Sequence, residues 1–172
     1  YDEEVINGYG DGDFRPDGEI NRAELTKMVI AAIADPDVNT YNNCFTDVED
    51  QWYAAYICYA KEQGWVNGYD NGQYKPEAQI TRVEAIKIIL EANLATGVAE
   101  EETIENTPYL DIFKDTWYYK YFAYAYNNNL LDKNHVEDNN FSPGKNITRK
   151  EVAEMIYRIN YSRSSTTNSG VP

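Results

Sequence analysis

Three arginines occupy the same place in three near-copies of one short phrase. Residues 20–24, 80–84 and 147–151 read Ile-Asn-Arg-Ala-Glu, Ile-Thr-Arg-Val-Glu and Ile-Thr-Arg-Lys-Glu. Asn or Thr followed three residues later by Glu is a capping box, in which both side chains bind backbone N–H groups at a helix start. Arg22, Arg82 and Arg149 therefore fall at the first helical position. Beside uncommitted amides and the positive end of a helix dipole, such an arginine could hold an anionic group.

Other residue types that catalyse reactions or bind metals are scarce. The chain has two cysteines, Cys44 and Cys58, and one histidine, His135, which excludes a Cys/His zinc cluster and disfavours a cysteine–histidine hydrolase. A disulfide and a pair of buried thiols fit the two cysteines equally well. No carboxylate pair stands out for glycoside hydrolysis, and Arg15 occupies a ligand position in the calcium-like loop that begins at Asp13. The sequence predicts neither an enzyme nor a bound cofactor or metal.

The charge balance limits the partners. The 172 residues include 29 acidic and 15 basic side chains, which gives a formal net charge of −14. Nucleic acids and anionic membranes attract clustered Lys and Arg, so neither is expected as a partner. The sequence has no run of about 18 apolar residues, so we expect no membrane insertion. An anionic ligand would need local positive pockets, and the 16 tyrosines and three tryptophans could either stack on sugars or form the core.

An internal repeat determines the architecture. The turn at 7–16 recurs at 67–76, and the same offset carries Arg22 onto Arg82. A diverged third copy keeps a Phe-Ser-Pro sequence at 141–143 but has Leu131-Asp132-Lys133 where an Asn-Gly-Tyr sequence is expected. Glycine permits positive φ and proline prevents continuation of a helix, so these segments are predicted to be turns.

A second module precedes two of these turns. Segments 45–48 and 109–112, followed by Trp52 and Trp117, each predict a short extended stretch that leads into a helix, over 54–63 and 119–129. Only residues 1–6 precede the first turn, and they match the end of such a helix. We therefore expect the first repeat to lack its front half.

The helices behind the arginines have apolar stripes with a period of 3.6 residues, which predicts that they meet in one bundle. The stripes comprise Leu25, Met28, Val29, Ala32 and Ile33, then Val83, Ile86 and Leu90, then Val152, Met155, Ile156 and Ile159. Segments 34–43 and 96–108 read as polar connectors, and 162–172 reads as a disordered tail or the start of a linker.

These motifs resemble the S-layer homology domain, whose repeats run from an aromatic-x-Asp-Val element through a Trp, a helix and a Gly-rich turn to Ile-Thr-Arg-Ala-Glu. The resemblance covers the chain up to about residue 160. It implies a mainly α fold, in which tandem helix-turn-helix repeats form a pseudo-threefold, three-pronged helical bundle. The expected repeats span 1–36, with its front half absent, 44–96, and 108–161, with a diverged turn.

The resemblance also implies site residues. The family's ligand-binding arginine matches Arg22, Arg82 and Arg149, its Asp matches Asp47 and Asp111, its Trp matches Trp52 and Trp117, and its turn glycine matches Gly8 and Gly68. Lys133 stands where the third glycine belongs, so we expect Arg82 to serve the most intact site. Trp65 and Tyr69 flank the second turn and could form a sugar platform or only seal the bundle. The arginines could instead be structural ion-pair partners, the two family tryptophans could be core, and the capping box already explains Glu24, Glu84 and Glu151.

Two functions follow as expectations. The resemblance implies noncovalent anchoring of a bacterial surface protein to a cell-wall polysaccharide, pyruvylated or otherwise anionic, or to modified peptidoglycan, through grooves between repeats. The location would be extracellular, at the cell wall or S-layer. The alternative is a structural module that assembles with copies of itself or with other surface-layer chains, because an incomplete bundle leaves an apolar face exposed.

Overall fold

The fold consists of five helices joined by long turns. The computed structural model describes residues 12–33, 38, 43–94, 96–132 and 138–167, with the backbone alone for 162–167. The helices are α1 (Arg22–Ile33), α2 (Ala54–Glu62), α3 (Arg82–Asn93), α4 (Tyr119–Asn127) and α5 (Arg149–Thr167). Isolated β-bridges occur, but the described residues form no strand. The prediction of a mainly α fold is confirmed.

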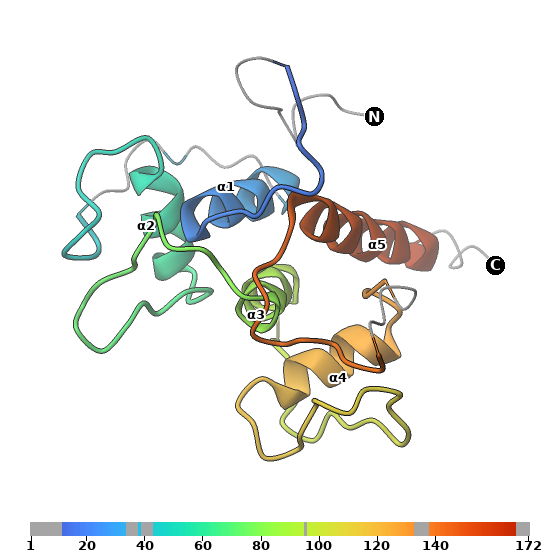
Figure 1. Cartoon of the computed structure of the whole chain (residues 1–172). Coiled ribbons are helices and arrows are strands. Elements are labelled where there is room, and N and C mark those ends of the chain that lie inside the picture. The colour runs from blue at the N-terminus through green and yellow to red at the C-terminus, as the bar shows by residue number, and fades with distance from the viewer. Residues whose placement is uncertain (1–11, 34–37, 39–42, 95, 133–137, 168–172) are drawn as a thin grey trace.

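The helices are arranged as three prongs around a centre. Figure 1 shows α3 end-on in the middle, with α1 and α2 on one side, α5 on the other and α4 below. Helix α2 packs on α1, α4 packs on α3, and α1, α3 and α5 contact one another. The predicted repeat 44–96 contains α2 and α3, and the predicted repeat 108–161 contains α4 and most of α5. Each packed pair therefore joins helices of two different repeats.

A ring of backbone hydrogen bonds joins the three prongs at their centre. The N–H of Ile20 donates to the carbonyl of Ile147, that of Ile147 to Ile80, and that of Ile80 to Ile20, at 3.3, 3.0 and 3.4 Å. All three isoleucines are buried. Isolated bridges between Asn21 and Gln79, Thr81 and Asn146, and Glu19 and Thr148 surround this ring. The segments just before α1, α3 and α5 therefore interlock in a closed cycle.

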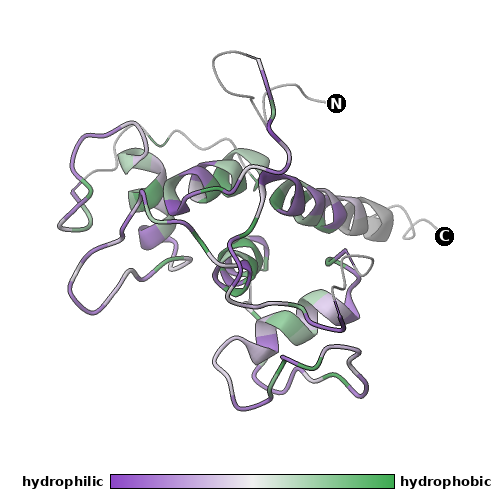
Figure 2. Cartoon of the chain, in the orientation of Figure 1, coloured by the Kyte–Doolittle hydropathy of each residue, from purple (hydrophilic) through white to green (hydrophobic). Residues whose placement is uncertain are grey.

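The core lies between the helix faces that carry the apolar stripes. Figure 2 shows hydrophobic residues along the helices and hydrophilic residues over most of the connecting turns. The stripe residues are buried, except that Ala32 and Ile33 are only partly so. Tyr74 and Phe122 are the largest fully buried side chains. Burial of these faces supplies the main favourable free energy, about 25 cal/mol per Å² of apolar surface.

Some local predictions need correction. Segment 45–48 is a tight turn closed by a hydrogen bond from the Val48 N–H to the Phe45 carbonyl, so the predicted extended stretch is wrong there. Helices α2 and α4 end at Glu62 and Asn127, slightly before their predicted ends. The tail predicted from residue 162 begins too early, because α5 continues through Thr167. Of the described helices, none is long and apolar enough to cross a bilayer.

A disulfide joins Cys44 to Cys58, so the alternative of two buried thiols is wrong. It links the segment before the 45–48 turn to the middle of α2. In the third repeat, Ala123 in α4 occupies the place of Cys58. The disulfide thus cross-links the second repeat and not the third.

Candidate functional site

Each of the three arginines reaches the turn of the next repeat in the cycle. Arg22 Nε donates to the Tyr74 carbonyl at 2.8 Å, and Arg149 Nε donates to the Phe14 carbonyl at 3.0 Å. Arg82 binds the Phe141 carbonyl through Nη1 instead. All three arginines are at least 93% buried, with exposed fractions of 7%, 5% and 7% for Arg22, Arg149 and Arg82. Their guanidinium groups thus pin one repeat to the next.

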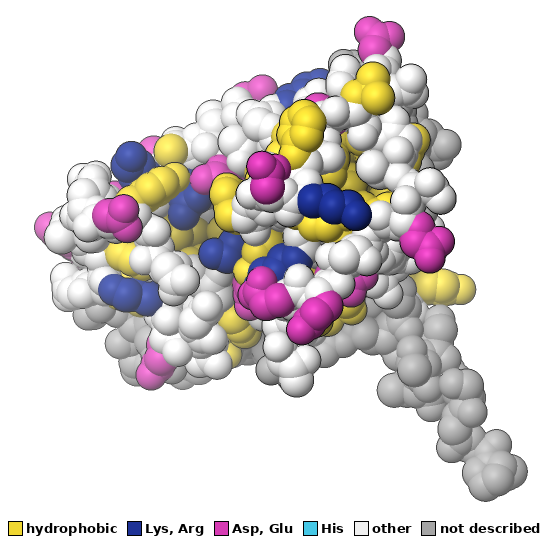
Figure 3. Space-filling view, turned by 90° about the horizontal axis from the view of Figure 1, so that it is seen from below, with side chains coloured by type: hydrophobic (Ala, Val, Ile, Leu, Met, Phe, Trp, Pro, Cys, Tyr) yellow, Lys and Arg dark blue, Asp and Glu magenta, His cyan; other side chains and the backbone are white. Residues whose placement is uncertain are grey.

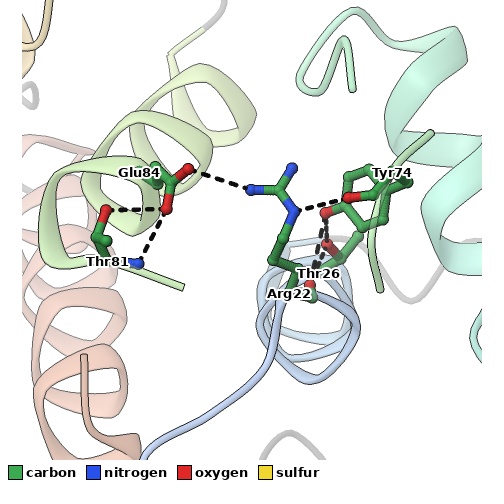
Figure 4. Close-up of polar contacts among 5 residues, drawn as sticks. All are labelled: Arg22, Thr26, Tyr74, Thr81 and Glu84. Atoms are coloured by element: carbon green, nitrogen blue, oxygen red, sulfur yellow. Dashed lines mark hydrogen bonds and ion pairs between the residues drawn. The ribbon is translucent and has the colours of Figure 1, made fainter. Parts of the chain in front are cut away.

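A glutamate from the next repeat's helix faces two of these arginines. Glu84 Oε1 lies 3.7 Å from Arg22 Nη1, whereas Glu151 Oε1 lies 2.6 Å from Arg82 Nη2. Figure 4 shows Arg22 between Glu84 of α3 and the Tyr74 and Thr26 pair. Arg22 and Arg82 therefore form structural ion pairs, as the sequence-based alternative expects. The Arg22 pair is the looser of the two.

All three predicted capping boxes form. The N–H groups of Asn21, Thr81 and Thr148 donate to the Glu24, Glu84 and Glu151 carboxylates at 2.8–3.0 Å. The returning bonds run from the glutamate N–H groups to the cap side chains. These contacts confirm the structural role predicted for the three glutamates.

The helix-start amides are not free for a ligand. The N–H groups of Arg22 and Ala23 donate to the carbonyls of Ala78 and Pro76, both at 3.0 Å. The corresponding residues of α3 and α5 donate in the same way to the third and first turns. The expectation of uncommitted amides is wrong, because the neighbouring repeat's turn already occupies them. An anion at these sites must bind side chains.

Asp47 and Asp111 brace the turns. Both oxygens of Asp47 accept backbone N–H groups, from Tyr74 and Lys75, at 2.8 Å each. Asp111 accepts those of Phe141 and Ser142 in the same way. Lys75 and Ser142 have φ of 57° and 58°, a left-handed conformation that is costly for non-glycine residues. The two carboxylates therefore hold a strained step before each proline, and ligand contact by them stays a prediction.

A groove lies between α1 and α3. This α1–α3 groove has a volume of about 200 Å³ and is lined by Arg22, Trp65, Val66, Asn67, Gly68, Glu84, Lys87, Ile88 and Trp117. The predicted site residues Arg22, Gly68, Trp65 and Trp117 thus come together here, although Trp117 belongs to the third repeat. The lining has two basic side chains and one acidic side chain.

A second groove lies between α3 and α5. This α3–α5 groove has a volume of about 140 Å³ and is lined by Asp17, Arg82, Ile86, Leu130, Leu131, Asp132, Phe141, Lys145, Ile147, Thr148, Lys150, Glu151, Glu154 and Met155. Its lining has three basic and four acidic side chains. Figure 3 shows Lys and Arg lying singly or in small groups among acidic and apolar side chains, so positive charge is local on the face in view.

The structure corrects one pairing expected from the sequence. Gly68 lines the groove of Arg22, whereas Arg82 faces the diverged third turn at Leu131, Asp132 and Phe141. The premise that Arg82 serves the most intact site is therefore wrong, since each turn packs on the preceding repeat's arginine. Gly8, Lys133 and His135 lie outside the described residues.

Gly68 has a steric reason to be glycine. Its φ is +69°, and a Cβ there would lie 2.5 Å from the Phe45 ring and 2.7 Å from the Gln73 carbonyl oxygen. A side chain would therefore strain the turn and displace the Phe45 ring. The glycine shapes this wall of the groove.

The predicted aromatic residues have different positions. Trp52 and Trp117 are 56% and 57% exposed, so the core alternative is wrong for both. Trp65 is partly buried, packs edge-on against Tyr59 at 5.6 Å and lines the α1–α3 groove. The ring of Tyr69 lies 5.0 Å from the Arg22 guanidinium carbon. Tyr69 thus supports the arginine rather than lining either groove.

Sequence reasoning missed Lys87. It lies five residues after Arg82, where α1 has Lys27 and α5 has Glu154. Alignment of the three helices on their arginines could have revealed this difference. Lys27 instead lies 5.6 Å from the Trp52 ring.

Tyr74 lies beneath Arg22 and is held there by Thr26. Its hydroxyl lies 2.6 Å from Thr26 Oγ1, which donates to the Arg22 carbonyl at 2.8 Å. Burial raises the pKa of Tyr74 above its usual value of 10.0, although the nearby Arg22 acts in the opposite direction. The described residues contain no group of His, Cys, Asp and Glu side chains suited to a metal ion.

A family model of the S-layer homology domain matches residues 1–26, 45–86 and 108–153. The chain belongs to this family. It is 32% identical to the Surface layer protein of Brevibacillus choshinensis over 51% of the chain and 8% of that protein. It is 29% identical to Cell surface glycoprotein 1 of Acetivibrio thermocellus over 89% of the chain and 7% of that protein. It is also 28% identical to the Cellulosome-anchoring protein of the same species over 79% of the chain and 31% of that protein.

The chain therefore matches less than a third of the length of these relatives. The S-layer homology match and the surface-layer relatives indicate a non-catalytic surface-anchoring module located outside the cell, at the cell surface. The second matched region contains α2 and the start of α3, and the third contains α4 and the start of α5.

Proposed function

We propose that this S-layer homology domain anchors its protein noncovalently to an anionic cell-wall saccharide through the α1–α3 groove. The observation that carries the proposal is the state of Arg22. Its Nε is fixed by the Tyr74 carbonyl, while the ion pair of Nη1 with Glu84 is long, at 3.7 Å. A ligand carboxylate at the terminal nitrogens can therefore bind without displacing a short ion pair.

The remaining groove residues suit a sugar. Trp65 and Trp117 offer apolar ring surface, and the Asn67 side chain can donate to and accept from hydroxyl groups. Gly68 leaves the turn free of a side chain at this wall. The groove thus combines a cation, aromatic surface and a polar amide, and no bond of the ligand needs to be broken.

The expected affinity is modest. A charge-assisted hydrogen bond contributes about 1.5–3 kcal/mol, so one groove alone holds a saccharide weakly. Several anchored domains on one surface layer would increase retention through avidity. Pyruvylated polysaccharide and modified peptidoglycan both supply carboxylates that fit Arg22.

Sedimentation with purified sacculi tests the proposal. Binding should fall after mild acid removes ketal-linked pyruvate if that group is the ligand, and should persist if a peptidoglycan carboxylate is the ligand. Arg22→Gln should lose most of the binding, because glutamine keeps a donor for the Tyr74 carbonyl but not the charge. Arg82→Gln is the matched control and should bind as the wild type does.

Equal binding by the wild type and Arg22→Gln would contradict the proposal. Circular dichroism of both variants checks that the helices are retained. Absence of wild-type binding to any sacculi preparation would contradict it as well.

Self-association is the second candidate function. Tyr157 and Tyr161 of α5 are 57% and 64% exposed, and their rings stack at 6.1 Å. Tyr157 occupies the position of Ile30 in α1 and Leu90 in α3, both of which are buried. This exposed aromatic face supports packing against a second copy of the chain. Sedimentation equilibrium without saccharide tests it, and a monomer at all concentrations would contradict it.

A further inference from the structure

The two described grooves have side chains of opposite charge at one equivalent helix position. Lys87 lines the α1–α3 groove, and Glu154 lines the α3–α5 groove. Each lies three residues after the capping-box glutamate, so it is on the same helix face as Glu84 or Glu151. The repeat frame therefore places opposite charges at the same point of two grooves.

The two side chains are also in different states. Lys87 is partly buried, and its ammonium has no hydrogen bond or ion pair within the part of the chain that the structure describes. Glu154 accepts hydrogen bonds from Arg158 Nε and Nη2 at 3.0 and 2.7 Å. A partly buried, unpaired ammonium attracts an anion more strongly than a solvated one does. A carboxylate at the same position repels it.

The neighbouring charges act in the same direction. Arg82 is neutralised by Glu151 at 2.6 Å, while Arg22 is only loosely paired. Asp132 in the α3–α5 groove takes the place of Asn67 in the α1–α3 groove. With Lys145 and Lys150 counted, the α3–α5 lining has one more acidic than basic side chain, whereas the α1–α3 lining has one more basic than acidic side chain. An anion would thus meet net repulsion in the α3–α5 groove.

We infer that the side chain three positions after the capping-box glutamate of a groove determines whether that groove binds an anionic saccharide. Lys87 makes the α1–α3 groove an anion site, and Glu154 closes the α3–α5 groove to anions. The inference rests on the proposed function, because it assigns specificity within the same binding event. It concerns the two grooves whose walls the structure describes.

Tryptophan fluorescence can report which groove is occupied. Two of the three tryptophans, Trp65 and Trp117, line the α1–α3 groove, and no tryptophan lines the α3–α5 groove. In a Trp52→Phe background, all tryptophan emission therefore comes from the α1–α3 groove. Calorimetry counts ligands at every groove.

The probe is a methyl hexopyranoside with a pyruvate ketal, and its neutral counterpart has an ethylidene acetal without the carboxylate. Lys87→Glu should weaken binding of the ketal by about tenfold or more, since it replaces an attraction with a repulsion. Lys114→Glu makes the same change in net charge at an exposed residue that lines neither groove, and it should have affinity within about twofold of the wild type. Binding of the neutral acetal should be equal in all variants.

Glu154→Lys should gain a ligand. Calorimetry should show one more ketal site than in the wild type, while the fluorescence change keeps its wild-type amplitude. Glu154→Gln separates loss of repulsion from gain of attraction, and should show a weaker additional site.

Two results would overturn the inference. Wild-type affinity in Lys87→Glu would exclude Lys87 as the selector, and an unchanged number of sites in Glu154→Lys would exclude Glu154. Either result with wild-type binding intact leaves the proposed function standing. If the wild type binds neither the ketal nor sacculi, the proposed function itself fails.

Discussion

The α1–α3 and α3–α5 grooves share one backbone frame but differ in the side chains that fill it. In both, an arginine reaches a turn carbonyl, a capping-box glutamate faces it, and an aspartate braces the turn. Thr26 and Tyr74, which lie beneath Arg22, correspond to Ile86 and Phe141 of the second groove, and Lys87 of the first groove corresponds to Glu154 of the second. Because backbone contacts maintain the frame, the groove side chains can diverge without loss of the fold.

The largest expected effect comes from the turn that walls the α1–α3 groove. Gly68→Ala should lower the free energy of unfolding by about 3 kcal/mol, because the new Cβ overlaps Phe45 and the backbone is left-handed. Urea denaturation measures this change. Gly144→Ala is the matched control in the third turn, where a Cβ meets nothing within 4 Å. Equal stability of the two variants would show that the two turns are not distinguished by packing.

The disulfide should strengthen only the α1–α3 side. Replacement of Cys44 and Cys58 by alanine removes a cross-link with a separation of 14 residues, and should cost about 3 kcal/mol. Hydrogen exchange should then show faster opening in α2 than in α4, whose repeat has no disulfide among the described residues. Uniformly faster exchange in both helices would argue that the two repeats unfold as one unit.

The polar pair beneath Arg22 can be converted to the apolar pair beneath Arg82. Tyr74→Phe or Thr26→Val alone should cost about 1 kcal/mol, since each leaves a buried partner without its bond. The double variant should be close to the wild type, because both polar groups are then absent, as at Ile86 and Phe141. Thermal unfolding of the four proteins gives the coupling. Additive losses would mean that the pair is not coupled.

High pH should destabilise the two grooves unequally, with a smaller effect. Burial raises the pKa of Tyr74 above 10.0, so its stabilising contribution is full below about pH 10 and is lost as pH rises through the folded-state pKa. Phe141, its counterpart, cannot ionise. Tyr74→Phe should therefore reduce the loss of stability between about pH 9 and about pH 11. An unchanged loss in this variant would assign the effect to other tyrosines.

The sequence predicted the repeat frame well because that frame depends on local signals. Capping boxes, apolar stripes and turn prolines identified all three arginine helices and both helices that precede a turn. It failed where partners come from another repeat. The grouping of Arg22 with Gly68, the occupied amides at the helix starts and the presence of Trp117 in the α1–α3 groove depend on how repeats interlock. Lys87 was missed for the same reason, since its neighbours in the groove come from α1 and the second turn.

The closed ring of Ile20, Ile80 and Ile147 has a consequence for how such chains can grow. Every member both donates to one neighbour and accepts from the other, so the count of repeats in one ring is fixed at three by closure. Duplication of a single repeat would give a fourth copy whose backbone groups find no free partner in the ring. Lengthening by whole triplets, each closing its own ring, is the route that leaves every backbone group satisfied.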